Sequence, residues 1–341
     1  MTTRTLAREI SSLGVLVCAL ACAACGSDDP SPTPERGWHE AFDASETGWL
    51  LSTWGPSRND QYAVGGTEAE GRVEHYDGKS WSRLELGVST PLLNWVHGFG
   101  SDDVTIVGNA GTVLHLSNGV WTKQTTPTDQ NLWGVWGATP NDLWSVGGSG
   151  KNEGDATVLH FDGTTWTQVT LPKLAKAGVM AFFKVWGTSA DNVYVVGQAG
   201  AVLHYDGTSW KEELVGASSD LIAVWGTGPS DVVAVGGRAI GSVSRWDGSS
   251  WHTESLGPLP GLNGVWTRKP GTVHVVGVAG TLGVLHTADW SFVDHSRPID
   301  LDVHGVFASD GGPLVAVGGN FAGAVPPYRG IALERRLESD E

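Results

Sequence analysis

Histidines recur at equivalent places along this sequence, each in a short apolar run that leads into a turn. Imidazole can ligate a metal or carry a proton. Metal ligands, however, must all lie within about 2 Å of one ion, and these histidines belong to separate repeats. We therefore predict a repeated hydrogen bond to the turn acids Asp60, Asp103, Asp142 and Asp231 instead of a metal site. The histidines are His75, His115, His160, His204 and His286.

Other catalytic motifs are sparse in the chain. It has no Gly-x-Ser-x-Gly nucleophile turn, no His-Glu-x-x-His and no phosphate-binding glycine loop. No Asp-x-Asp-x-Asp spacing supports a calcium loop. We therefore expect no catalytic residue, no metal and no cofactor. Carboxylate pairs assembled from distant repeats are the one catalytic arrangement that stays open.

The elements that position these residues are repeats. An aromatic anchor, most often in a Trp-Gly pair, is followed eleven positions later by the glycine of a Val-Gly pair, and successive anchors lie 39 to 50 residues apart. A constant inner spacing within a variable outer one indicates a repeated supersecondary unit. The anchors are Trp54, His97, Trp136, Trp186, Trp225, Trp266 and Phe307, and the glycines are Gly65, Gly108, Gly147, Gly197, Gly236, Gly277 and Gly318.

Each repeat contains four short runs rich in β-formers. In the third repeat these cover residues 132–136, 143–147, 158–161 and 166–170, with an Asp-Gly turn before the fourth. Such runs separated by Gly, Asp, Asn and Pro predict antiparallel strands, and Asp-Gly is a strong hairpin signal. Four strands in 40 to 45 residues are typical of a β-propeller blade. We expect most of the tryptophans, which also recur, to pack blade against blade.

The two ends of the repeat region complement each other. The seventh repeat stops after its third run, and residues 37–42 before the first anchor supply a fourth-strand sequence. A strand contributed from the other terminus would close the ring and leave no unpaired edge. The predicted fold is an all-β, seven-bladed β-propeller over residues 37–336, followed by a short acidic tail at 337–341.

The repeat resembles those of bacterial secreted β-propellers that read roughly VWG, NDVWAVG and LHYDG with a following Trp. Residues 135–147 (VWGATPNDLWSVG) and 201–210 (AVLHYDGTSW) carry the resemblance most fully. The chain is more distantly similar to Asp-box (sialidase-like) and photosystem assembly-factor propellers, although Asp and Gly are adjacent here. Sialidase chemistry would need an Arg-Ile-Pro segment, and Ser-Arg-Pro-Ile at 296–299 has the wrong order. Such propellers include enzymes, lectins and scaffolds, so the resemblance implies the fold alone.

The first 25 residues predict export. Arg4 and Arg8 precede an apolar run at 13–25 that ends in small residues, as in a secretory signal, and the run is short for a permanent membrane helix. The ending Cys-Ala-Ala-Cys resembles a lipoprotein lipobox, with cleavage after residue 24 and lipid on Cys25. Cleavage before Cys22 and an ordinary secretory signal are the alternatives. Residues 25–36 read as a flexible tether.

The positions of the cysteines and the net charge limit the kinds of site and partner expected for the exported domain. The other cysteine, Cys18, also lies in the signal, so the exported domain has no disulfide and no thiolate site. The net charge is −16, and removing residues 1–24 takes away +1 and leaves −17. Nucleic-acid phosphates require a basic surface. We therefore expect no nucleic acid, and a monomer that meets the membrane through its lipid.

Loop length indicates which face of the ring binds. Loops joining strands two to three and four to one emerge on one face, and their lengths vary. On the other face the spacing from strand one to strand two is constant and the three-to-four turns are short. Variable loops on a rigid scaffold tend to carry binding groups, although neutral drift would also vary them. The candidates are Asn109, Lys151, Asn152, Lys173, Lys176, Gln198, Arg238, Asn320, Tyr328 and Arg329.

These observations favour one function and leave two others open. We expect a lipoprotein at the bacterial outer membrane or cell surface that acts as a non-catalytic binding or scaffolding module for an envelope protein or glycan. A glycan-binding lectin predicts several equivalent pockets, each with an exposed aromatic side chain beside polar groups. A glycan-active hydrolase or lyase predicts one acidic cleft with converging carboxylates.

Overall fold

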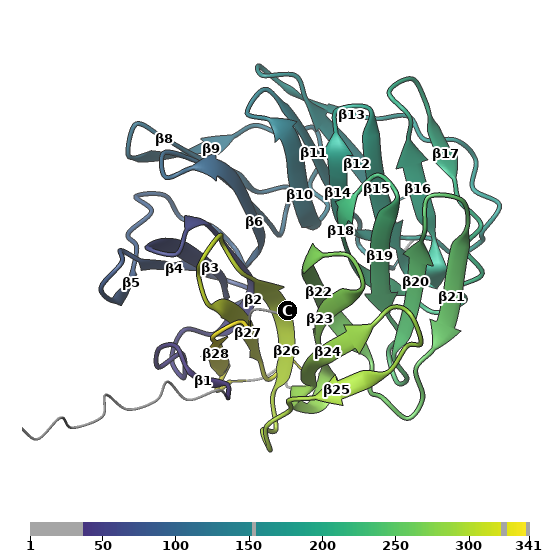
Figure 1. Cartoon of the computed structure of the whole chain (residues 1–341). Helices are drawn as coiled ribbons and strands as arrows, with labels where there is room; N and C mark the ends of the chain where they lie inside the picture. The colour runs from purple at the N-terminus through teal and green to yellow at the C-terminus, as the bar shows by residue number, and fades with distance from the viewer. Residues whose placement is uncertain (1–36, 152–154, 322–325, 339–341) are drawn as a thin grey trace, which may run out of the picture. The chain divides into compact units, whose positions relative to one another are not determined.

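The computed structural model describes residues 37–151, 155–321 and 326–338. The predicted signal peptide, the tether and Cys25 lie outside the described residues. Within the described residues, 28 strands form seven antiparallel sheets of four strands each (Figure 1). The predicted seven-bladed β-propeller is therefore confirmed.

The sheets stand around a common axis, with one strand of each innermost. The innermost strands are β2 (Trp49–Ser57), β6 (Leu93–Gly100), β10 (Leu132–Thr139), β14 (Phe182–Ser189), β18 (Leu221–Gly228), β22 (Leu262–Lys269) and β26 (Asp302–Phe307). The second strands are β3 (Asp60–Gly66), β7 (Asp103–Gly108), β11 (Asp142–Gly147), β15 (Asn192–Gly197), β19 (Asp231–Gly236), β23 (Thr272–Gly277) and β27 (Leu314–Gly319).

The outer half of each blade is shorter. The third strands are β4 (Gly71–Tyr76), β8 (Val113–Ser117), β12 (Thr157–Phe161), β16 (Val202–Tyr205), β20 (Ser242–Trp246), β24 (Leu282–His286) and β28 (Gly330–Arg335). The fourth are β5 (Trp81–Arg83), β9 (Val120–Gln124), β13 (Trp166–Gln168), β17 (Trp210–Glu212), β21 (Trp251–Ser255), β25 (Phe292–Asp294) and β1 (His39–Glu40). We call the face with the two-to-three and four-to-one loops the loop face, and the opposite one the turn face.

The helical elements among the described residues are two single-turn 3-10 segments on the loop face, η1 (Gln198–Gly200) and η2 (Val278–Gly280). None of the described helices has the length and apolar character that crossing a bilayer requires.

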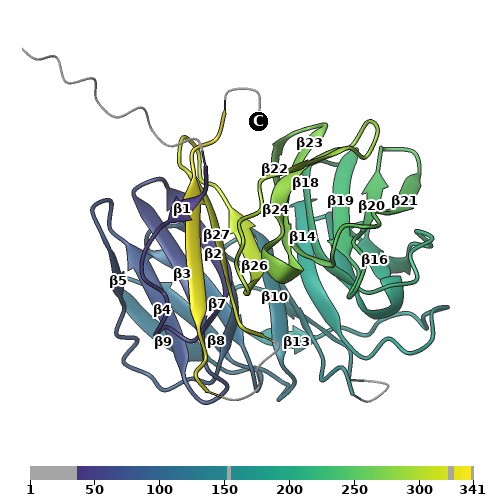
Figure 2. The ribbon, with the colours of Figure 1, turned by 90° about the horizontal axis from the view of Figure 1, so that it is seen from below.

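The ring closes as the chain ends predict. β1 pairs antiparallel with β28, placing His39 opposite Glu334, and Ala41 N donates to Ala332 O at 3.0 Å (Figure 2). Trp38 is buried with side chains of the sixth and seventh blades, and Arg297 of the sixth blade donates to its carbonyl oxygen at 3.0 Å. The N-terminal strand is therefore paired with the end of the chain and packed against its neighbouring blade.

The Trp-Gly pair reflects packing between neighbouring blades. A Cβ added to Gly187 would lie 2.7 Å from Cη2 of Trp136, and one added to Gly226 would lie 2.6 Å from Cη2 of Trp186. The anchor ring of one blade thus occupies the space beside the glycine of the next. Close packing of this kind leaves no room for a side chain there.

The Val-Gly glycines mark a second close approach. A Cβ on Gly147 would lie 2.0 Å from Asn131 O, where the backbone enters β10. Near its start, each inner strand contains one residue that has no partner on the second strand. This is a β-bulge, which changes the direction of the side chain of that residue. The seven bulged residues are Leu51, Asn94, Trp133, Phe183, Ile222, Asn263 and His304.

Candidate functional site

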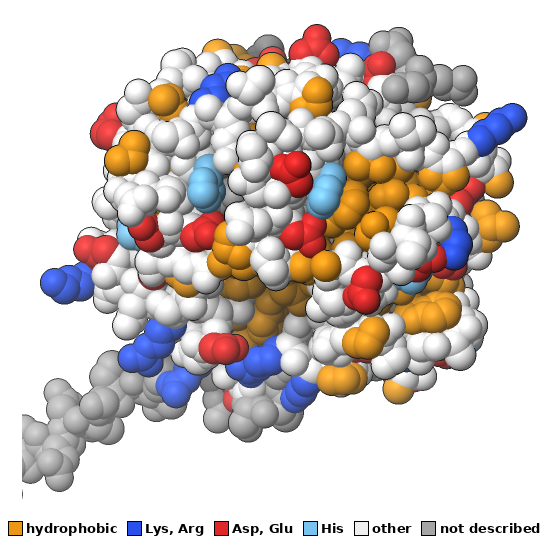
Figure 3. Space-filling model, turned by 90° about the horizontal axis from the view of Figure 1, so that it is seen from above, with side chains coloured by type: hydrophobic (Ala, Val, Ile, Leu, Met, Phe, Trp, Pro, Cys, Tyr) orange, Lys and Arg blue, Asp and Glu red, His pale blue; other side chains and the backbone are white. Residues whose placement is uncertain are grey.

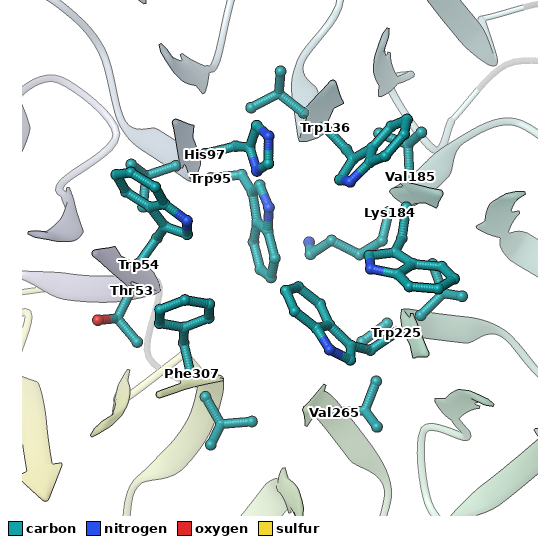
Figure 4. A pocket seen from close by; sticks show the side chains of 16 residues that line it. Thr53, Trp54, Trp95, His97, Trp136, Lys184, Val185, Trp225, Val265 and Phe307 are labelled. Atoms are coloured by element: carbon teal, nitrogen blue, oxygen red, sulfur yellow. The ribbon is translucent and has the colours of Figure 1, made fainter. Parts of the chain in front are cut away.

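Aromatic anchors close the central channel. Trp54, His97 and Trp136 follow one another around the axis with ring centroids 6.2 and 6.4 Å apart, and Trp225 lies 6.1 Å from Phe307 (Figure 4). The space left between them is about 20 Å³, enough for about one water molecule. The anchors therefore nearly fill the channel, and we call this layer of anchor rings the plug.

Lys184 projects into this channel from β14. At the equivalent position, two residues before the anchor, the other blades carry small residues, except for Trp95. The Lys184 Nζ points toward the axis, 4.3 Å from the Trp95 ring centroid, and donates to Trp133 O at 2.8 Å (Figure 4). The side chain is 3 % exposed, and burial lowers its pKa to about 7. The small equivalents are Ser52, Gly134, Ala223, Gly264 and Gly305.

Above the plug, the channel widens into a cavity at the loop face. Its volume is about 270 Å³, near the lower end of the roughly 300–1,000 Å³ typical of ligand pockets. Four of the seven bulged residues form its walls, and Lys184 also lines it. The two-to-three loops of the third to fifth blades supply the rim. The lining residues are Trp133, Ser149, Gly150, Ala181, Phe183, Lys184, Gln198, Ile222, Arg238 and His304.

The cavity is electropositive. Its charged side chains are Lys184 and Arg238, and none of the described residues that line it is acidic. His304 donates from Nδ1 to Leu51 O at 2.9 Å. Its pKa is lowered to about 3, first by burial and then by the charge of Lys184, with a smaller effect from Arg238, while the bond to Leu51 opposes the shift. His304 is therefore neutral at pH 7 and shares the cavity lining with two cationic side chains.

Electropositive lining contrasts with the rest of the protein. The chain carries a net charge of −16, and on the side drawn in Figure 3 the acidic side chains are scattered among neutral ones. Arg238 at the rim donates to Asp220 at 2.9 Å and keeps its guanidinium 5.3 Å from the Phe183 ring centroid. The bond to Asp220 is made by Nε of the guanidinium.

Two of the predicted site residues reach the cavity, Gln198 and Arg238. Gln198 is held by Met180, whose backbone N–H donates to Oε1 at 2.8 Å. Lys176 has a structural contact instead, because its Nζ donates to Ala199 O at 2.8 Å and also to Ala217 O. It thereby ties the loop before β14 to the loop before β18.

Asn109 and the seventh-blade loop also lie on the loop face without lining the cavity. The Asn109 Oδ1 accepts from the buried Asn94 at 2.9 Å. Asn320 accepts from Trp49 Nε1 at 3.2 Å, and the Tyr328 ring packs edge-on against Trp49, with centroids 4.8 Å apart. Arg329 forms an exposed ion pair with Asp300 at 3.3 Å.

The remaining candidates are Lys151, Lys173 and Asn152. Lys151 and Lys173 are exposed and lie outside the cavity lining. Asn152 lies outside the described residues.

Sequence reasoning missed the cavity walls and floor: Trp133, Phe183, Lys184, Ile222 and His304. One signal could have found the walls. Three residues before each anchor, the repeats carry Leu, Asn, Trp, Phe, Ile, Asn and His, whereas the anchors themselves are all aromatic. A position that varies in chemistry within a strict repeat is not constrained by the packing that the repeat shares.

The predicted histidine bonds are present in three blades. Nε2 of His75, His115 and His160 donates to the turn acid of its own blade, at 2.7, 3.1 and 2.7 Å. The prediction was wrong for Asp231, which pairs with Arg245, because arginine takes the histidine position in that blade. His204 bonds to Asn192 instead of an aspartate. No cluster of three metal-ligating side chains occurs among the residues that the structure describes.

The sequence matches no known protein family and no curated protein. Solved structures match well. YCF48 bound to D1 peptide is 16 % identical with a TM-score of 0.65, covering 90 % of this chain and 99 % of that chain. YCF48 from Cyanidioschyzon merolae is 13 % identical with a TM-score of 0.65, covering 88 % and 99 %. A streptogramin B lyase structure is 11 % identical with a TM-score of 0.67, covering 87 % and 96 %.

Matches at this level of identity establish the fold, and they include both a peptide-bound protein and a lyase. The chain is a seven-bladed β-propeller, similar in structure to YCF48 and to other propellers.

Proposed function

We propose that this protein is an exported, lipid-anchored and non-catalytic binding propeller that holds an envelope partner at its loop face. The observation that carries this proposal is the cavity at the channel mouth. Its walls are bulged residues that depart from the repeat, while the anchors beneath it keep the repeat and seal the channel. A rigid ring that varies at one concave mouth is well suited to ligand binding.

Similarity to YCF48 supports a polypeptide partner. One of the solved YCF48 structures holds D1 peptide. Since identity is 16 %, this likeness supplies a class of ligand to test and no contact residues. An exposed protein loop or chain end could reach the cavity, which opens on the face where the long loops emerge.

The two alternatives receive less support from the described residues. A lectin with repeated pockets would need equivalent linings. The cavity between the third and fourth blades has Trp144, Tyr205 and Trp210 in its wall, and these occupy other positions of the repeat than the residues that line the mouth cavity. A paired-carboxylate hydrolase would need two acids in one cleft, and the lining of the mouth cavity is basic. A glycan array with the purified full chain tests the lectin directly.

Site-specific photo-crosslinking in intact envelopes tests the binding face. A photoreactive amino acid replaces Lys151, an exposed residue of the loop face, or, as matched control, Lys79, an exposed residue of the turn face. We expect a discrete crosslinked species from position 151 alone. The species should weaken in Ile222→Trp, which fills the cavity from its wall. Equal crosslinking from position 79, or no species from either position, would contradict the assignment.

Lipid labelling tests the anchor. Cells fed an alkyne-tagged fatty acid should label the wild-type protein and Cys22→Ser, while Cys25→Ser should lose the label. If the label is lost in Cys22→Ser and retained in Cys25→Ser, cleavage occurs before Cys22 instead. If neither the wild-type protein nor the variants are labelled, the protein carries no lipid.

A further inference from the structure

The amine of Lys184 is the most unusual group in the molecule. It is 3 % exposed, and among the described residues it makes no ion pair with a carboxylate. Burying an ammonium without a counter-ion is costly, so natural proteins usually pair it. Within the described part of the chain its Nζ makes one hydrogen bond, to Trp133 O, which leaves two N–H directions for another acceptor.

The amine is placed where a ligand could reach it. Lys184 lines both the sealed channel and the open cavity above it, and its Nζ points toward the axis (Figure 4). Glycine and alanine at the equivalent positions of other blades give the side chain this space. A Cβ on Gly134 would already lie 3.0 Å from Lys184 Cα. The repeat thus excludes a bulky neighbour from one side of the lysine.

The other lining residues indicate which ligand chemistry is complementary to the cavity. Trp133, Phe183 and Ile222 present apolar walls, and Arg238 adds a second cation at the rim. His97 below and His304 beside the amine are kept neutral at pH 7, since burial lowers their pKa values to about 4 and about 3. Among the described residues that line the cavity, the cationic groups at pH 7 are therefore Arg238 and Lys184, whose amine is about half protonated because its pKa is about 7.

We propose that this cavity binds the carboxylate of a small apolar acid, with Lys184 and Arg238 on the carboxylate and Trp133 and Phe183 against its apolar body. A carboxylate matches a single buried ammonium in charge and accepts its free N–H groups. The cavity volume of about 270 Å³ lies just below the roughly 300–1,000 Å³ typical of pockets for drug-sized ligands, which favours a smaller molecule. One ring with a short carboxylate arm fits that space.

The inference deepens the proposed function, since it names the chemistry of the group that enters the loop-face cavity. The carboxylate could belong to a free acid or to the end of a polypeptide. Phenylacetate represents the first source. A short peptide ending in phenylalanine represents the second, and its C-terminally amidated form is the control.

Calorimetry with the full chain in detergent provides the test. Phenylacetate, phenylacetamide and inorganic phosphate are titrated at pH 6 and pH 8, each in two buffers of different ionisation enthalpy. We expect phenylacetate to bind at least tenfold more tightly than the amide or phosphate. At pH 8 the free amine is mostly neutral, so binding should take up close to one proton, whereas at pH 6 it should take up almost none.

Variants separate binding from structure. Lys184→Met should lose the proton uptake and at least tenfold in affinity, and Arg238→Gln, at an exposed site, should weaken binding severalfold. Lys176→Met is the matched control, because Lys176 also bonds to backbone carbonyls on the loop face but does not line the cavity. It should bind as wild type does. Far-UV circular dichroism checks that each variant is folded.

Two results would overturn the inference: equal binding of phenylacetate and its amide, or no binding of either phenylacetate or the free-acid peptide. The acid–amide comparison uses the wild-type protein and so does not depend on any variant folding. Tighter binding of the free-acid peptide than of phenylacetate would support the inference and assign the carboxylate to a chain end. Crosslinking from position 151 without carboxylate binding would leave the proposed function standing and remove this ligand class.

Discussion

Packing of each anchor ring against a glycine of the next blade makes Gly187→Ala the sharpest test of the fold. The added Cβ would lie 2.7 Å from Trp136 Cη2 and 2.6 Å from Asn192 O, whereas ordinary contacts begin at 3.4 Å. The ring or the strand must therefore retreat by several tenths of an ångström in a close-packed interface. Overpacking of this size costs about 1–3 kcal/mol, or about 2–6 °C in melting temperature for a domain of this size.

Urea unfolding followed by far-UV circular dichroism measures the loss of stability. Gly228→Ala is the matched control, since Gly228 likewise lies in the last residues of an inner strand, has a negative φ and has nothing within 4 Å of an added Cβ. It should change the free energy of unfolding by no more than about 0.5 kcal/mol. Trp136→Phe shortens the opposing ring, so the double variant with Gly187→Ala should be more stable than additivity predicts, by about 1 kcal/mol. Equal effects of Gly187→Ala and Gly228→Ala, or strict additivity, would refute the packing account.

Three further predictions concern charge, closure and metal. The pKa of Lys184 is lowered from 10.5 to about 7, so between these values the unfolded chain holds a proton that the folded chain lacks. The wild-type free energy of unfolding should then rise relative to Lys184→Met as pH increases from 7 to 9, by at most about 1.4 kcal/mol per pH unit, and parallel pH profiles would refute this. Trp38→Ala removes a buried ring that joins the chain ends and should cost about 3–5 kcal/mol in urea unfolding; a loss below 1 kcal/mol would show that closure does not depend on it. Adding a chelator should leave the melting temperature unchanged, and a fall in melting temperature would indicate a bound ion. Asp142→Asn, which alters a half-buried pair with His160, should lower the free energy of unfolding by no more than about 1 kcal/mol.

The cavity and the plug show how one repeat can supply both stability and specificity. Anchors and their partner glycines pack against the next blade, so they tolerate little change. Four of the seven residues at the bulge, three positions earlier, line the cavity at the mouth of the channel instead. Lys184 and Trp95, two before the anchor, share the space that small residues leave in the other blades. Differences among repeats therefore concentrate where a ligand could enter.

The sequence by itself determined the blades. Strand runs, Asp-Gly turns and the fixed anchor spacing act over a few residues, so local physical preferences are visible in the chain. The missing fourth strand after the seventh repeat, with a fourth-strand sequence at residues 37–42, also determined how the ring closes. Variable loop lengths identified the face on which Gln198 and Arg238 line a cavity.

Only the tertiary structure decided which side chains meet. Lys184 and His304 belong to different blades, and their approach depends on ring curvature and on one bulge in each inner strand. Neither the ring curvature nor the bulge is visible in the sequence periodicity, because a bulge changes the direction of one side chain without changing the spacing between anchor and glycine. Burial of the Lys184 amine likewise follows from small residues in other blades, far from it in sequence. Local patterns thus set the scaffold, while convergence around the axis made the site.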